Sequence, residues 1–92
     1  MKYKVKDYFV MKDVAGDKIV LARGATSIVF SGVLILNESC AFLWNHMSEF
    51  ITVEHLAMLL IDEYGIHRDT AIKDTESCIS KMLEYDILDT ME

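Results

Sequence analysis

The sequence predicts an α+β domain in which three strands come first and three helices follow. The order of patterns is the first observation, because β-branched and aromatic residues dominate residues 7–36 whereas residues 38–86 have apolar residues at helical spacing. The second is the direct join between these halves, where the apolar run of residues 28–36 stops at Asn37. The third is length, since 92 residues provide one modest core, and we expect residues 1–92 to form a single domain.

The first half of the chain predicts a three-stranded antiparallel sheet. Residues 7–14 and 18–23 have strand patterns, and the small residues at Ala15-Gly16-Asp17 between them predict a hairpin turn. Residues 28–36 form a third strand that is apolar on both faces, although only one face can rest on the helices. Gly32, in the middle of this strand, permits close approach of another backbone. The strand is therefore either wholly covered by core or free at an edge for a partner.

The first helix begins directly after the third strand. Asn37 suits its N-cap, because the side-chain oxygen can accept a hydrogen bond from a free backbone N–H of the first turn. The apolar face then contains Cys40, Leu43, Trp44 and Met47, at i, i+3, i+4 and i+7.

Two further helices complete the predicted β-β-β-α-α-α order. Thr52 is an N-cap candidate for the second helix, and Gly65 suits the left-handed position after its end. Asp69 is the expected cap of a third, amphipathic helix over residues 68–86, while residues 89–92 are expected to fray.

This arrangement resembles a winged helix-turn-helix domain, and a transcriptional regulator is therefore one alternative. The charges disfavour it. Residues 1–24 hold six Lys/Arg and three Asp, whereas residues 25–92 hold three Lys/Arg and twelve Asp/Glu, within a net charge of −6. The third helix would present an acidic surface to phosphates, so we expect no nucleic acid partner. Binding to duplex DNA that weakens with salt would support the regulator.

Neither catalytic residues nor a cofactor site are predicted. His46, His55 and His67 show no metal-ligand spacing, so we expect no metal site and solvated histidines. Cys40 and Cys78 each lie on the apolar side of a predicted helix, and we expect two buried free thiols with a structural role.

The sequence also predicts a cytoplasmic protein. No apolar run reaches the length of a membrane span, and the N-terminal segment lacks the features of a signal peptide.

A binding module is the function that remains. If residues 28–36 lie at the edge of the sheet, an extended peptide can add to it as a fourth strand, with the third helix as the wall of a groove. The strand can instead be ordinary core, or two copies of the chain can form a homodimer by pairing these edges or by swapping the N-terminal hairpin.

The strand-to-helix join LILNESCAFLWNHM and the segment ITVEHLAMLLIDEYGIHRDTAIKDTESCISKMLEYDIL resemble the corresponding regions of the PqqD (pyrroloquinoline quinone biosynthesis protein D) family. The resemblance covers residues 7–88 and lies in the order and spacing of elements. One departure is Thr75 after Asp74, where relatives often have valine.

The resemblance implies a non-enzymatic peptide chaperone, that is, a recognition element for ribosomally made and modified peptides. Such a protein binds the leader of a precursor peptide as an added strand and presents it to a modifying enzyme, which is a radical SAM protein, peptidase, cyclase or dehydratase. The peptide-binding residues that we expect on the strand are Val29, Phe30, Ser31, Gly32, Val33 and Leu34. Those that we expect on the third helix are Ala71, Thr75, Cys78 and Met82, flanked by Lys73 and Lys81, with Ile72, Ile79 and Leu83 in the core.

Overall fold

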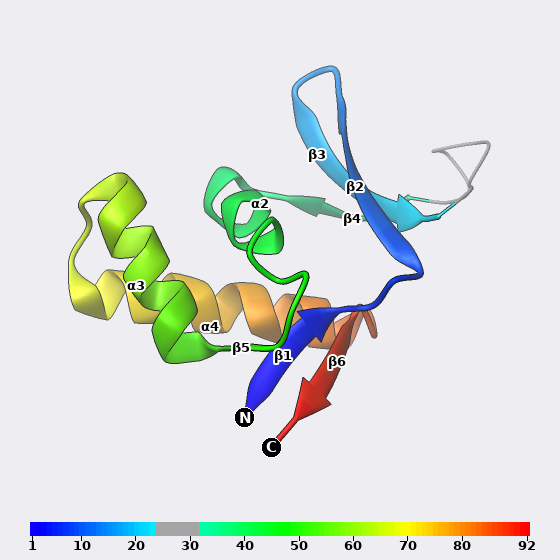
Figure 1. The fold of residues 1–92 in the computed structure, drawn as a ribbon. Helices are drawn as coiled ribbons and strands as arrows, with labels where there is room; N and C mark the ends of the chain where they lie inside the picture. Colours follow the sequence, from blue (N-terminus) through cyan, green and yellow to red (C-terminus); the bar gives the residue numbers. More distant parts are fainter. Residues whose placement is uncertain (24–31) are drawn as a thin grey trace.

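The computed structural model describes residues 1–23 and 32–92, and its elements confirm the predicted α+β class (Figure 1). In chain order they are β1 (Lys2–Val5), β2 (Phe9–Val14), β3 (Asp17–Ala22), β4 (Gly32–Leu36), α2 (Glu38–Trp44), β5 (Ile51–Thr52), α3 (Val53–Tyr64), α4 (Arg68–Glu84) and β6 (Leu88–Met91). The predicted three-stranded antiparallel sheet is β2-β3-β4, and the three helices follow it. Among the described residues, no helix combines the length and apolar character that crossing a bilayer requires.

Strands β2 and β3 form the predicted hairpin, with a turn that needs an unusual backbone. The register pairs Val14 with Asp17, so only Ala15 and Gly16 lie between the strands. Their φ angles are +53° and +90°, and positive φ at both central positions is the signature of a type I′ turn. The carboxylate of Asp13 accepts a hydrogen bond of 3.2 Å from the Gly16 N–H and so holds the turn from one side.

A second sheet, which the local patterns did not indicate, has the order β5-β1-β6. Strand β6 pairs antiparallel with β1 from Val5↔Leu88 to Lys2↔Met91, and the Leu88 side chain is buried. The expectation that residues 89–92 fray is therefore wrong, because β1 provides a partner for their backbone. The two ends of the chain consequently lie side by side (Figure 1).

Two of the three predicted N-caps are confirmed. The side-chain oxygen of Asn37 accepts a hydrogen bond of 2.9 Å from the Cys40 N–H, and that of Thr52 accepts one of 3.1 Å from the His55 N–H. Gly65 has φ of +62°, as predicted for the left-handed residue after α3.

The predicted N-cap of the third helix, Asp69, is two residues too late in the chain. Helix α4 begins at Arg68 after His67, whose side chain makes no capping hydrogen bond, and Asp69 lies inside the first turn. There its negative charge still interacts favourably with the helix dipole.

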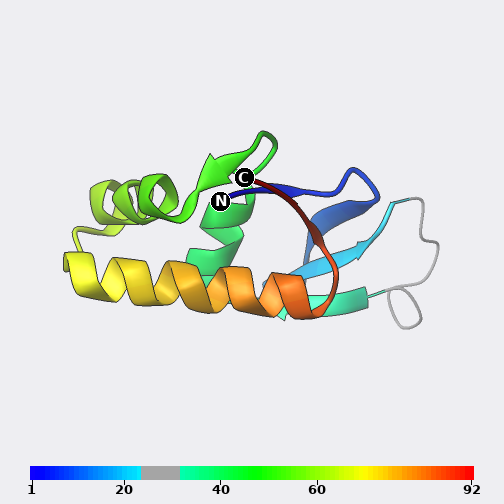
Figure 2. The same cartoon turned by 90° about the horizontal axis from the view of Figure 1, so that it is seen from below.

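One buried apolar cluster joins the β2-β3-β4 sheet to the helices. Helix α3 packs along α4, and α2 contacts both of them (Figure 2). The largest fully buried side chains are Leu43, Met47, Leu56, Leu60, Met82, Ile87, Val20 and Thr75. Helix α4 therefore contributes to the core along its length, while one side of it remains available to line a surface feature.

Candidate functional site

Strand β4 lies at the edge of its sheet, as binding of an added strand requires. It pairs antiparallel with β3, from Lys18↔Leu36 to Leu21↔Gly32. Within residues 1–23 and 32–92, no strand pairs with its other side. The backbone N–H and C=O groups on that side therefore have no strand partner among the described residues.

A pocket of about 310 Å³ lies between the end of β4 and helix α4, and we call it the β4–α4 groove. Strand β4 and the start of α2 supply one wall, and the middle and C-terminal part of α4 supply the other. The residues that line it are Ile35, Leu36, Asn37, Ser39, Cys40, Asp74, Ser77, Cys78 and Lys81.

The α4 wall has a polar face with opposite charges at its two ends. Asp74, Ser77, Cys78 and Lys81 recur at i, i+3, i+4 and i+7, which places them on one side of the helix. Seven residues of helix separate the carboxylate-bearing and ammonium-bearing positions by about 10 Å along the axis. An extended chain advances about 3.3 Å per residue, so roughly three residues of a bound strand would span the two charges.

Three of the four α4 residues that the sequence suggested for this wall belong to the core. Ala71, Thr75 and Met82 are 0% exposed, whereas Cys78 does reach the groove. The reason is that α4 packs against both α3 and α2, which widens its buried side and turns the suggested stripe inward. The polar residues that do line the groove could have been found in the sequence, because they form a stripe at helical spacing beside the apolar stripe.

Of the three residues of α4 that we expected in the core, two are at least half-buried and one is exposed. Ile79 is buried and Ile72 is half-buried, as expected, but Leu83 is 42% exposed and is not core. Of the two lysines expected to flank the wall, Lys81 lines the groove and Lys73 is not among its lining residues.

Strand β4 presents an exposed apolar side chain at the groove. Ile35 is 61% exposed and lines the groove, while Leu34 is half-buried and Leu36 is buried. The alternation confirms that only one face of this apolar strand packs on the core. An exposed isoleucine on a free strand edge is a typical contact for a partner.

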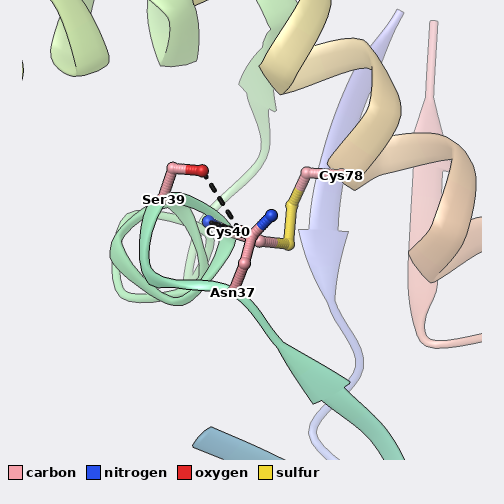
Figure 3. The surroundings of a disulfide bond; sticks show 4 residues. All are labelled: Asn37, Ser39, Cys40 and Cys78. Carbon is pink, nitrogen blue, oxygen red and sulfur yellow. Dashed lines mark hydrogen bonds between the residues drawn. A yellow bond between two sulfur atoms is a disulfide. The ribbon is translucent and has the colours of Figure 1, made fainter.

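The floor of the groove contains a disulfide between Cys40 of α2 and Cys78 of α4 (Figure 3). The two Cα atoms are 5.6 Å apart, and both residues are 6% exposed. The expectation of two free thiols is wrong, because packing α2 against α4 brings the apolar stripes that contain these cysteines together. Their spacing of 38 residues gave no local sign of this.

Asn37 links the disulfide to the end of β4. Its Oδ1 accepts hydrogen bonds from the Cys40 N–H and from the Ser39 hydroxyl, the latter at 3.1 Å (Figure 3). The residue that directly follows β4 is therefore hydrogen-bonded to the first cysteine of the disulfide.

A second pocket of about 340 Å³ continues from the groove past Asn37 and Asp74. Tyr64 and Ile66 provide its apolar surface, and Glu38 lies at its rim. Burial raises the pKa of the Tyr64 hydroxyl above its ordinary value, and the carboxylates of Glu38 and Glu63 act in the same direction. The hydroxyl is thus neutral and able to donate a hydrogen bond at ordinary pH.

The structure describes only half of the six strand residues that we expected to bind the peptide. Val29, Phe30 and Ser31 lie outside the described residues. Gly32, Val33 and Leu34 belong to β4, so their backbone is part of the edge strand.

Within the described ranges, no three His, Cys, Asp or Glu residues are grouped so that they could hold a metal ion.

Two solved structures share this fold. One, the lasso peptide synthetase B1 complexed with the leader peptide, matches with a TM-score of 0.70 and 13% identity over 98% of this chain and 100% of that one. The other, TbiB1 in complex with the TbiA(beta) leader peptide, matches with a TM-score of 0.70 and 16% identity over 97% and 98% of the two chains. No protein of curated function matches the sequence.

The family comparison agrees with the resemblance seen in the sequence. The profile of coenzyme PQQ synthesis protein D (PqqD) matches residues 9–88, from the start of β2 to the start of β6. The match includes the β2-β3-β4 sheet and all three helices, and therefore both walls of the β4–α4 groove. Because it covers most of the 92 residues, this chain belongs to the PqqD family.

Proposed function

We propose that this protein is a peptide-recognition element that binds the leader of a ribosomally synthesised precursor peptide as a strand added to β4. The observation that carries the proposal is the free edge of β4 beside a groove whose other wall is α4. Membership of the PqqD family supports it, as does the fold shared with two proteins whose structures contain leader peptides.

Backbone pairing alone is too weak for specific binding. About five added hydrogen bonds at roughly 0.5–1.5 kcal/mol each give only a few kcal/mol. Micromolar affinity needs about −8.2 kcal/mol after the ordering of the peptide has been overcome. Apolar contacts must therefore supply the rest, at roughly 1.5–3 kcal/mol for each side chain fully buried. Ile35 is exposed beside the edge and is suited to this contact.

The charges on α4 give the groove a direction. A bound strand would be stabilised by a cationic side chain near Asp74 and an acidic one near Lys81, and the reverse orientation would place like charges together. These pairs would act on orientation more than on affinity, because they are close to solvent.

The protein itself is not an enzyme in this proposal. The two cysteines at the groove are joined to each other, so neither is a free nucleophile. The bound peptide is instead presented to a separate modifying enzyme, such as a radical SAM protein, peptidase or cyclase, and the recognition element is a single unit over residues 1–92.

The neighbouring genes are first searched for a short open reading frame that encodes a precursor peptide. The test is then a titration with a fluorescein-labelled synthetic copy of the N-terminal segment of that peptide. We expect saturable binding, and replacement of Ile35 by Asp should raise the Kd by about tenfold or more because an apolar contact is lost.

Met58→Asp is the matched control, because Met58 on α3 is 59% exposed, close to the 61% of Ile35, and is not among the residues lining the groove. Both variants replace an exposed side chain and should remain folded. Equal weakening by the two substitutions, or no binding by the unmodified protein, contradicts the proposal. A doubling of molecular mass without peptide would instead indicate a homodimer, formed by pairing of the β4 edges or by swapping of the N-terminal hairpin.

A further inference from the structure

We propose that the Cys40–Cys78 disulfide is a redox-controlled link between the two walls of the β4–α4 groove, so that its oxidation sets the affinity for the leader peptide. This inference rests on the proposed function and adds a means of regulation to that site.

The position of the disulfide supports this role. Cys40 belongs to the wall formed by β4 and α2, Cys78 belongs to the α4 wall, and the bond joins them across the floor. The Cys40 N–H donates a hydrogen bond to Asn37, the residue that follows β4, so a shift of Cys40 would strain the contact with the end of that strand. A change at the sulfur atoms therefore alters the spacing of the surfaces that would hold the peptide.

The disulfide also lies at the surface of the groove. Both cysteines belong to the buried core at 6% exposure and also line the groove, so a reductant would approach the bond from the groove side. A thiolate of a dithiol attacks one protein sulfur, which forms a mixed disulfide and releases the other protein sulfur as a thiolate. The second thiol of the dithiol then displaces the first protein sulfur. The two electrons come from the dithiol, which becomes a disulfide, and the protein sulfurs take up two protons to become thiols.

Oxidation is expected to favour binding. The intact bond holds the walls at one separation before the peptide arrives, and a preorganised site loses less conformational freedom on binding. Reduction leaves two thiols, which need more room than one disulfide, and it removes the link between α2 and α4. A peptide in the groove would also cover the disulfide and hinder its reduction.

Thermodynamic linkage makes these two effects reciprocal. If reduction lowers affinity by a given factor, bound peptide must shift the thiol–disulfide equilibrium toward the disulfide by the same factor. A disulfide with a purely structural role would change stability without this coupling.

The experiment uses the full chain and the labelled leader peptide described above. Titrations are run with the oxidised protein, with protein reduced by dithiothreitol under anaerobic conditions, and after reoxidation with glutathione disulfide. Mass spectrometry after alkylation reports the thiol content of each sample. We expect reduction to weaken binding by about tenfold and reoxidation to restore it, in line with loss of a preorganised site.

The double variant Cys40→Ala/Cys78→Ala is the control, and dithiothreitol should leave its affinity unchanged. Circular dichroism of the reduced natural chain provides the second measurement, which does not depend on the variant folding. Equal affinity in both redox states overturns this inference alone. Unfolding of the reduced protein at room temperature assigns the bond a structural role and overturns it too, whereas absence of binding in both states overturns the proposed function with it.

Discussion

Thr75 is the residue whose chemistry fits its surroundings least well. It is fully buried on α4, and its Oγ1 is a buried side-chain oxygen that has no hydrogen-bond partner in the part of the chain that the structure describes. A buried hydroxyl that gives up its hydrogen bonds to water without replacement destabilises the fold. Its position inside the core also explains why it does not line the groove, although the helical pattern placed it on the same stripe as Cys78.

Replacement of Thr75 by Val should therefore stabilise the protein. The two side chains have nearly the same shape, and removing the unsatisfied hydroxyl should raise the free energy of unfolding by about 1 kcal/mol. Urea denaturation followed by circular dichroism measures the change. Thr70→Val is the matched control, since Thr70 is an exposed residue of the same helix and should be almost neutral. A loss of stability in Thr75→Val would show that the hydroxyl has a partner.

At the scale of elements, the β2–β3 hairpin combines a well-matched geometry with an unfavourable residue. A type I′ turn fits the twist of the strands, but it places Ala15 at φ of +53°, in the left-handed region that favours Gly or Asn. Gly16 occupies the other left-handed position without this penalty.

Ala15→Asn should accordingly raise the free energy of unfolding by about 0.5–1 kcal/mol, because Asn tolerates the left-handed region better than Ala. Ala15→Val should have the opposite effect, since a β-branched side chain is least tolerant of positive φ. Thermal melts of both variants test the pair, and a shift of the two melting temperatures in the same direction would contradict the assigned turn.

The ends of α2 and α3 could be predicted from the sequence, because each is set by residues only a few positions apart in the chain. The caps Asn37 and Thr52 each bond to an N–H three residues later, and Gly65 ends its own helix, so a short window of sequence contains the cause. The side of α4 that faces the groove was not predictable in this way. It depends on where α2 and α3 pack against α4. A rotation of α4 about its axis by the angle of one residue would exchange core and surface positions.

At the scale of the whole molecule, the second sheet and the disulfide have the same origin. Pairing of Lys2 with Met91 and of Cys40 with Cys78 joins segments that are distant in sequence, and no local pattern reports such contacts. The free edge of β4 was available as a hypothesis because the strand is apolar on both faces. The groove beside this strand could not be predicted, because it depends on where α4 lies in the folded chain.

Strand β6 should contribute measurably to stability, contrary to the behaviour of a frayed end. Removal of residues 88–92 exposes apolar surface that Leu88 covers and deletes the hydrogen bonds to β1, and should lower the free energy of unfolding by about 2–4 kcal/mol. Chemical denaturation measures the loss. Leu88→Ala in the full chain isolates the side-chain part, and a truncated protein as stable as the intact one would mean that the pairing is not maintained.

The adjacency of the first and last strands also has a practical consequence. Because β1 and β6 are antiparallel neighbours, both ends of the polypeptide emerge from the β5-β1-β6 sheet and not from the β4 edge (Figure 1). A few flexible residues suffice to join them, and a circularly permuted chain can be opened elsewhere without breaking the β2-β3-β4 sheet. Affinity tags, fluorophores or a fused enzyme can likewise be attached at either terminus, away from the β4 edge.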